Sequence, residues 1–205
     1  MNAVLFDLGK VLLDWDPRYF YARHFPGDAA ALERFVREVV APEWILQMDA
    51  GMPAAQAIAE RSRRFPEHAA LIAQWPHGWP TMLRGEISGS VAILAELRDR
   101  GHRLCALTNF STETFPIARA RHAFLGWFED VVVSGEHGLA KPDPRIFRLA
   151  IERCRLDPAR TVFIDDSPAN VAGGRAAGLH ALHFTSPERL RAALAALGLL
   201  RAGPA

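Results

Sequence analysis

The chain has 205 residues, of which 50% are hydrophobic and 23% are charged, and its formal net charge is +1 at pH 7. This length and composition are typical of a globular protein with one sizeable domain, or with a core domain that carries a smaller insert. The near-neutral charge argues against a nucleic-acid partner, and no apolar run approaches the roughly 18 residues that a membrane span needs. No basic residue precedes the apolar start, which Asp7 interrupts, so a signal peptide is not indicated and we expect a cytoplasmic protein.

The first predicted element is a strand over residues 2–8, a short apolar run rich in strand-forming residues. From about Asp16 to Glu86 the pattern changes, with no convincing strand and with helix-like stretches at 17–25, 28–40, 53–65 and 66–75. This segment and its border also hold four of the five tryptophans, which we expect to form the core of a small helical bundle. The pattern predicts a helical insert between the first strand and the rest of a sheet.

Strands and helices alternate in the remainder of the chain. Apolar runs typical of strands lie at 103–108, 130–134, 161–165 and 180–184, and helical patterns lie at 88–100, 112–123, 144–155, 168–177 and 186–198. Continuous apolar runs of this length suit strands that are buried on both faces. The alternation predicts an α/β fold with a doubly wound parallel sheet of the Rossmann-like kind.

Polar residues follow the ends of four predicted strands. They are Asp7, Thr108 with Asn109, Lys141 after a short loop, and Asp165 with Asp166. In an open parallel sheet, ligands bind beyond the carboxyl ends of the strands, so these side chains are predicted to converge. The chain has only two lysines, Lys10 and Lys141, among many arginines, which favours a need for a compact point charge at these positions.

This set of side chains has a chemical logic. Carboxylates gathered at one site repel each other unless a cation intervenes, and hard oxygen ligands suit Mg²⁺, which also accepts a phosphate oxygen from a substrate. A carboxylate can attack phosphorus and form an aspartyl phosphate, while hydroxyl, amide and ammonium groups bind the equatorial oxygens. Each residue by itself is also explained as a turn, a helix cap or a solvated charge. Their joint occurrence at strand ends favours a phosphoryl-transfer site.

Four strings in the chain resemble the motifs of the haloacid dehalogenase-like hydrolases. They are FDLGKVLLD at 6–14, LTNFS at 107–111, GLAKPDPRIF at 138–147 and FIDDSPANVAGGRAAG at 163–178. The resemblance covers nearly the whole chain. It implies a Rossmann-like core domain at 1–15 and 87–205, and a helical cap domain at 16–86 that covers the site and selects substrates.

The resemblance also implies roles for the residues that would handle the substrate, a small-molecule phosphate ester. Asp7 would be the nucleophile, and Thr108 and Asn109 would hold the phosphoryl group. Lys141 would orient both the nucleophile and the phosphate.

A Mg²⁺ site is implied in the same way. Asp7, Asp166 and the backbone carbonyl of Gly9 would ligate the ion, and Asp165 would lie close by or act through water. Asn170, one turn after Asp166, would belong to the same network.

The chain departs from the family pattern at Gly9. Most family phosphatases carry an aspartate there, two residues after the nucleophile, as general acid for the leaving group. The DLG string instead resembles a bacterial subgroup that includes sugar-1-phosphate phosphatases. An anomeric oxygen leaves more easily than an ordinary alkoxide, so it needs less help from an acid. Asp14 and Asp16 could supply a substitute acid or belong to the loop into the cap.

The resulting hypothesis is a Mg²⁺-dependent phosphatase that hydrolyses a small, sugar-1-phosphate-like metabolite through an aspartyl phosphate. A 2-haloacid dehalogenase is an alternative, with the same Asp7 nucleophile and no metal. That subgroup typically has a bulky aromatic residue in place of Gly9 and lacks the acidic pair Asp165–Asp166. A non-catalytic, phosphate-binding scaffold is a second alternative, and the oligomeric state stays open.

Overall fold

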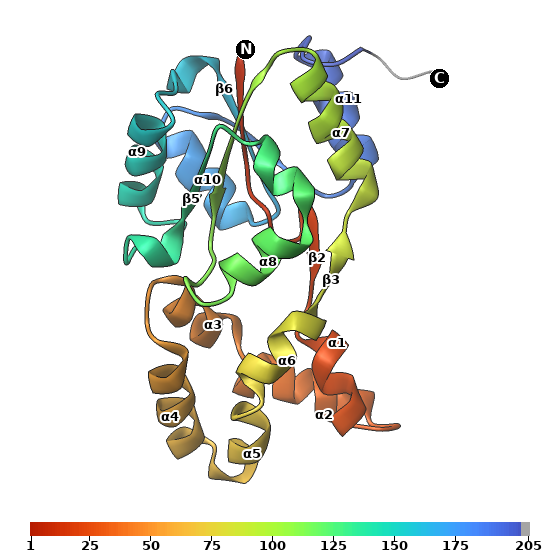
Figure 1. The fold of residues 1–205 in the computed structure, drawn as a ribbon, viewed down its shortest axis with the longest axis vertical. Helices are drawn as coiled ribbons and strands as arrows, with labels where there is room; N and C mark the ends of the chain where they lie inside the picture. The colour runs from red at the N-terminus through yellow and green to blue at the C-terminus, as the bar shows by residue number, and fades with distance from the viewer. Residues whose placement is uncertain (202–205) are drawn as a thin grey trace.

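A five-stranded parallel sheet forms the centre of the part of the chain that the structure describes, residues 1–201 of a computed structural model (Figure 1). The strand order is β5-β4-β1-β6-β7. The strands are β1 (Ala3–Phe6), β4 (Arg103–Thr108), β5 (Asp130–Val133), β6 (Thr161–Asp165) and β7 (His180–His183). Each strand matches its predicted apolar run to within two residues at either end, so the parallel sheet predicted from the sequence is confirmed.

Helices cover both faces of this sheet. They are α7 (Ser88–Asp99), α8 (Phe115–Arg121), α9 (Pro144–Arg153), α10 (Pro168–Ala176) and α11 (Pro187–Ala196), with the 3₁₀ turns η4 (Ala123–Trp127), η5 (Ser134–Glu136) and η6 (Pro158–Arg160). Along β1, Val4 and Phe6 pack into the apolar cluster that contains α7 and α11, whereas Ala3 and Leu5 pack into the cluster under α9 and α10. Successive strand side chains point to opposite faces, so this division confirms a doubly wound sheet.

The insert folds as helices at the lower end of the molecule in Figure 1, away from the N-terminus. They are α1 (Arg18–Tyr21), η1 (Ala22–His24), α2 (Ala29–Arg34), the π-helical η2 (Phe35–Val39), α3 (Pro42–Asp49), α4 (Ala54–Arg64), η3 (Pro66–His68), α5 (Ala69–Ile72) and α6 (Trp75–Met82). Its tryptophans are buried as expected: the rings of Trp44 and Trp75 meet edge to face at 4.9 Å, and Trp44 Nε1 donates to Ala57 O.

Helices α3 and α6 were not expected from the sequence pattern. The string WPHGWPTM of α6 contains two prolines and a glycine, which disfavour a helix interior. Burial outweighs that local preference, because Trp75, Trp79 and Met82 all face the apolar core. Gly78 has no side chain at the point where α6 crosses the ring of Phe20, and a Cβ there would lie 2.5 Å from that ring.

The expectation that residues 16–86 contain no strand was wrong at their C-terminal end. Strand β3 (Leu83–Glu86) pairs antiparallel with β2 (Leu13–Trp15), and Leu13 lies opposite Glu86. The four residues of β3, LRGE, include a glycine and two charges, so no apolar pattern marks them as a strand. Pairing with β2 makes them one. The two segments that connect the core to the insert therefore run side by side.

The insert also contacts the core away from this ladder. Hydrogen bonds run from Ser134 Oγ to Asp49 O (2.5 Å), from Ala54 N to Glu113 Oε1 (2.9 Å), and from Arg121 Nη1 to Pro80 O (2.6 Å). The rings of Trp79 and Phe110 pack edge to face at 5.5 Å. The ends of α3 and α6 thus rest on the loops that follow β4 and β5. We call this set of contacts the insert–core contact.

Across residues 1–201, every helix is either too short or too polar to pass through a membrane.

Candidate active site

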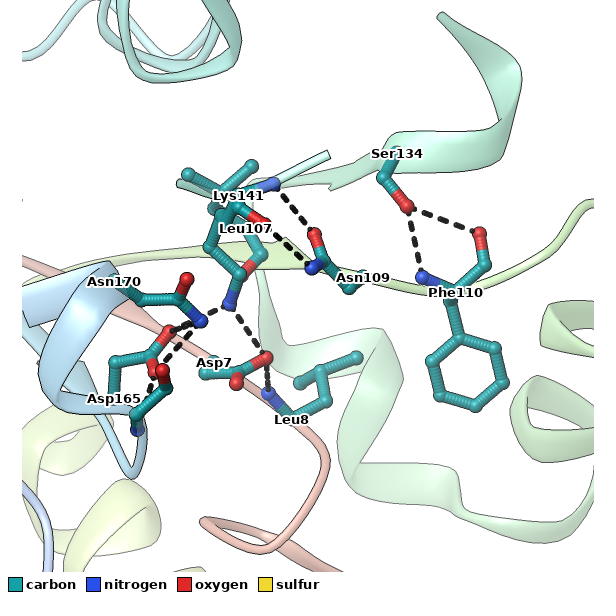
Figure 2. Close-up of polar contacts among 10 residues, drawn as sticks. Asp7, Leu8, Leu107, Asn109, Phe110, Ser134, Lys141, Asp165 and Asn170 are labelled. Carbon is teal, nitrogen blue, oxygen red and sulfur yellow. Dashed lines mark hydrogen bonds and ion pairs between the residues drawn. The ribbon is translucent and has the colours of Figure 1, made fainter. Parts of the chain in front are cut away.

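Lys141 stands at the centre of a polar cluster beyond the carboxyl ends of β1, β4 and β6 (Figure 2). Its ammonium group lies 2.9 Å from Asp7 Oδ1 and donates to Asp165 Oδ2 at 2.7 Å and to Leu107 O at 2.8 Å. Three acceptors match the three protons of the ammonium group. Lys141 is only 1% exposed, so its charge is neutralised by these carboxylates rather than by water.

Asn109 fixes the backbone of Lys141 rather than pointing a free amide at the site. Its Oδ1 accepts from Lys141 N at 2.8 Å, and its Nδ2 donates to Lys141 O at 3.0 Å (Figure 2). Both polar ends of the side chain are therefore committed to the loop that carries the lysine. These bonds use one of the two Nδ2 protons, so the expected contact of Asn109 with a phosphoryl group stays a prediction.

Asp165 is the most enclosed of the acidic residues in the cluster. It is 0% exposed, and its Oδ1 accepts from Ser167 N at 2.9 Å and from Asn170 Nδ2 at 3.0 Å, while its Oδ2 takes the Lys141 ammonium. The sequence predicted this grouping of Asp165 with Asn170 and Lys141. Its neighbour Asp166 is only partly buried and lines a cleft that Asp7 also lines.

Asp7 is oriented through one of its two carboxylate oxygens. Oδ1 accepts from Leu8 N at 2.7 Å and from the Lys141 ammonium. Burial raises the pKa of Asp7 to about 7; Lys141 opposes this effect, and Asp165 and Asp166 add to it. The pKa of Asp166 is raised as well, first by burial and then by Asp165. The cluster thus holds more negative charge than one lysine offsets.

The carboxylates satisfy the chemistry of a magnesium site. Asp7, Asp165 and Asp166 each offer an oxygen, and these atoms lie within 4.8 Å of one another. Hard oxygen ligands with a surplus of negative charge suit Mg²⁺. The pKa values of Asp7 and Asp166 are raised first by burial and then by the neighbouring carboxylates, and a bound cation would favour the charged forms against both effects. The residues present therefore fit the predicted ion.

Thr108 ends β4 beside this cluster. Within residues 1–201 its buried Oγ1 has no hydrogen-bond partner. Leaving a buried hydroxyl unpaired costs about 1–3 kcal/mol, so it either reflects strain or marks a place for an absent partner. Thr108 does not line either of the cavities described next.

Two adjoining cavities lie between the core and the insert, and Asp7 lines the larger one. The cleft, of about 580 Å³, is lined by Asp7, Asp166, Asn170 and Lys10, and by Arg18 and Arg37 of the insert. The apolar chamber, of about 100 Å³, has walls that include Met48, Trp75, Trp79, Leu83 and Phe110. The residues that line both cavities are Gly9, Trp15, Ile45, Asp49 and Asn109.

Asp49 lines both cavities and is not marked as a site residue by the sequence. This residue ends α3, a helix that no clear apolar pattern indicated, and it faces both cavities from the insert. Burial raises the pKa of Asp49 to about 7, while Lys141 and the backbone of Ser111 lower it. The only local signal is a single acid followed by Ala50 and Gly51, and such a string is common in turns.

Replacing Gly135 with alanine is expected to disturb the loop that follows Asn109. A Cβ at Gly135 would lie 2.9 Å from Phe110 O and 3.0 Å from Thr112 N, and neither backbone atom can move without the loop. We expect the variant to lose about 1–3 kcal/mol of unfolding free energy and part of its activity. Gly126→Ala is the matched control, because its Cβ would meet nothing within 4 Å. Equal urea midpoints for the two variants would contradict the prediction.

The chain is similar to haloacid dehalogenase-like hydrolases. A family model with that description matches residues 1–178. Acyl-CoA dehydrogenase family member 10 of Mus musculus is 27% identical in an alignment of 213 positions that covers 91% of this chain and 18% of that protein. Hexitol phosphatase A of Escherichia coli K12 is 28% identical in an alignment of 193 positions that covers 91% of this chain and 84% of that protein.

A solved structure extends the likeness to the fold. A HAD family enzyme from Bacteroides thetaiotaomicron, crystallised in complex with magnesium and inorganic phosphate, superposes with a TM-score of 0.67 at 22% identity. The match covers 91% of this chain and 95% of that chain, so the sheet and the insert are both part of the shared architecture. Against the much longer mouse protein, the chain spans less than a fifth of the length.

Proposed function

Because the chain belongs to the haloacid dehalogenase-like hydrolase family, we propose that it is a Mg²⁺-dependent phosphatase acting on a small phosphate ester. The observation that carries the proposal is the buried Lys141 ammonium, which joins Asp7 to Asp165 beside the half-buried Asp166. In such a cluster, one carboxylate can attack phosphorus, while the other carboxylates hold the lysine and the metal ion.

Asp7 is the proposed nucleophile. Leu8 N and the Lys141 ammonium hold its Oδ1, so Oδ2 is the oxygen left to approach the phosphorus. A bond forms between that oxygen and phosphorus, and the ester P–O bond breaks, with its electron pair leaving on the ester oxygen. Water then attacks the phosphorus of the aspartyl phosphate, which releases inorganic phosphate and restores the Asp7 carboxylate.

Two further groups support the handling of the phosphoryl oxygens. The unpaired Thr108 hydroxyl is a donor that a phosphoryl oxygen could satisfy, and the Lys141 ammonium is a fixed positive charge beside the nucleophile. Asn109 acts through Lys141, because its amide holds the lysine backbone in place. We therefore assign Asn109 a positioning role in the proposed site.

The metal site proposed here consists of Asp7, Asp166 and the backbone carbonyl of Gly9. Asp165 already accepts hydrogen bonds from Lys141, Ser167 and Asn170. Its proposed role is therefore to orient Lys141, or to contact the metal ion through a water molecule. When bound, Mg²⁺ would offset the charge of the phosphate and of these carboxylates. The magnesium and phosphate bound by the structurally similar Bacteroides enzyme support this choice of ion.

Residues 16–86 are proposed to act as the cap that selects the substrate. The cleft is lined by the core on one side and by α2, η2 and α3 on the other, so a substrate held at Asp7 would contact both. The hexitol phosphatase among the relatives supports a small phosphorylated carbohydrate as substrate. A sugar-1-phosphate is the form that would tolerate glycine at position 9, since its leaving group is activated.

Phosphate release from a panel of esters tests the proposal. The purified protein would be incubated with glucose 1-phosphate, acetyl phosphate and p-nitrophenyl phosphate in Mg²⁺ or in EDTA. We expect release in Mg²⁺ and a loss of at least about 100-fold in EDTA, because the carboxylates and the phosphate then repel each other.

Halide release from 2-chloropropionate is measured in parallel. Metal-independent halide release would identify a haloacid dehalogenase instead and would contradict the proposal. If neither phosphate nor halide is released but inorganic phosphate binds in a Mg²⁺-dependent manner, the result would favour the non-catalytic scaffold.

A further inference from the structure

The place of the missing general acid is physically empty in the structure. A Cβ built on Gly9 meets no atom within 4 Å, although Gly9 lines both the cleft and the apolar chamber. The space that a side chain at residue 9 would enter is therefore open. A proton donor for the leaving group has room there, and it must come from another element.

Five carboxyl side chains line the cleft: Asp7, Asp16, Glu33, Asp49 and Asp166. Asp7 and Asp166 belong to the acidic cluster, while Asp16 and Glu33 are both ion-paired with Arg18. Asp14, the other substitute suggested by the sequence, accepts from Tyr19 Oη at 2.7 Å and lines neither cavity. Among residues 1–201, Asp49 is the acid at this cleft that forms no ion pair and stands outside the cluster.

The backbone of Asp49 is held against the core. It is the last residue of α3, and its carbonyl oxygen accepts a hydrogen bond from Ser134 Oγ. Ser134 is 0% exposed and is itself fixed to the loop after β4, since its Oγ accepts from Phe110 N at 2.9 Å. Gly51 follows in the left-handed region at φ +96°, and a Cβ there would lie 3.2 Å from Gly135 O. The turn that carries Asp49 therefore has little freedom while the insert–core contact is made.

The surroundings of Asp49 raise the pKa of its carboxyl, so its protonated form is populated at neutral pH. The chamber walls are mostly apolar, with Asn109, Ser111 and Thr114 as their polar members. Burial raises the pKa of the Asp49 carboxyl to about 7, against the lowering effects of Lys141 and the Ser111 backbone. On the packed turn η5, Glu136 is directed to Arg153. The other charged groups that line the cleft with Asp49 are Asp7, Lys10, Asp16, Arg18, Glu33, Arg37 and Asp166.

We propose that Asp49, reaching in from the insert, is the general acid that protonates the leaving group in place of the residue absent at Gly9. This inference rests on the proposed phosphatase function. As the ester P–O bond breaks, the electron pair on the leaving oxygen takes the proton of Asp49, which yields the free alcohol and the Asp49 carboxylate. In the second step, that carboxylate takes a proton from the water that attacks the aspartyl phosphate, which restores the starting state.

Protonation of the leaving group would then depend on the insert–core contact. The acid would be in place only while α3 rests on Ser134, so a substrate that fails to seat beneath the insert would not be protonated on leaving. The role of Asp49 also predicts the direction of the pH dependence. Asp49 donates only when protonated, so turnover of esters with poor leaving groups should fall as pH rises above about 7.

The test compares Asp49→Asn with the wild type on two esters in Mg²⁺. For glycerol 2-phosphate, whose alkoxide needs a proton, we expect kcat to fall by about 100-fold and the loss of activity above neutral pH to disappear. For p-nitrophenyl phosphate, whose phenolate leaves unaided, kcat should change only a few-fold. Glu43→Gln, an exposed change on the same helix, is the matched control and should match the wild type on both esters.

Rescue separates a chemical role from a structural one. Gly9→Asp introduces an acid into the open space beside Asp7, and adding it to Asp49→Asn should restore turnover of glycerol 2-phosphate at least 10-fold. Equal losses on both esters, or an unchanged rate on glycerol 2-phosphate, would contradict the role of Asp49 alone. A wild-type protein that releases no phosphate from either ester would contradict the proposed function, and the role of Asp49 with it.

Discussion

Asp7→Asn is expected to reduce phosphate release by at least about 10⁴-fold, the scale seen when a nucleophile is removed. The amide has nearly the shape of the carboxylate, so Leu8 N and the Lys141 ammonium keep an oxygen acceptor at the position of Oδ1. The lost group is the second oxygen with its negative charge, which alone can form the acyl phosphate. Circular dichroism and an unchanged elution volume would serve as controls for folding. A variant that keeps a tenth of the wild-type rate would rule out Asp7 as the nucleophile.

The same variant has an expected signature in stability. The pKa of Asp7 is raised from 3.8 to about 7 in the folded protein, so the folded state binds the proton more tightly than the unfolded chain. Its contribution to stability is full below pH 3.8 and is lost as pH rises through about 7. Asparagine cannot ionise. In EDTA, the melting temperature of Asp7→Asn minus that of the wild type should therefore be larger at pH 8 than at pH 4.5. A constant difference would mean that Asp7 is not destabilised by its charge.

Lys141→Met is expected to damage both stability and activity. The methionine fills much of the volume but leaves Asp7 and Asp165 as buried carboxylates without their cation. Breaking a buried pair in this way costs about 3–5 kcal/mol, because the desolvated charge stays behind. Urea unfolding at pH 7.5 in EDTA would measure the loss, and phosphate release should fall to background.

A double-mutant cycle makes this second prediction specific. Adding Asp165→Asn removes one of the stranded charges, so the double variant should be less destabilised than the sum of the two single variants. Simple additivity would show that Lys141 acts through packing alone. Lys141→Arg is expected to be less stable and less active than the wild type although it keeps the positive charge, because the larger guanidinium has no room at a position that is 1% exposed.

The sequence predicts the core well for a physical reason. Strands buried on both faces must be apolar along their whole length, so β1, β4 and β6 are visible as short hydrophobic runs. Polar residues directly after such runs have few explanations, and their meeting at one sheet edge follows from the parallel arrangement. For that reason the sequence alone groups Asp7, Lys141 and Asp165 at one edge of the sheet.

The insert is harder to predict because its structure depends on contacts between segments. Helix α6 forms in spite of two prolines because its tryptophans are buried, and β3 is a strand only because β2 lies beside it. Nothing in the string around Asp49 reveals that the end of α3 lines the same cleft as Asp7. Asn109 could be placed at the site but not assigned its partner, since the bond to the Lys141 backbone spans 32 residues of chain.

The β2–β3 ladder has a consequence for how such proteins diversify. The chain leaves the core at Trp15 and returns at Leu83, and these residues are partners in an antiparallel pair. Neighbouring strands lie about 4.8 Å apart, a gap that a two-residue hairpin turn can close. The whole module between them can thus be shortened, lengthened or exchanged without altering the register of the five-stranded sheet. Exchange of this segment would change the insert residues that line the cleft and leave Asp7 and its strand unaltered.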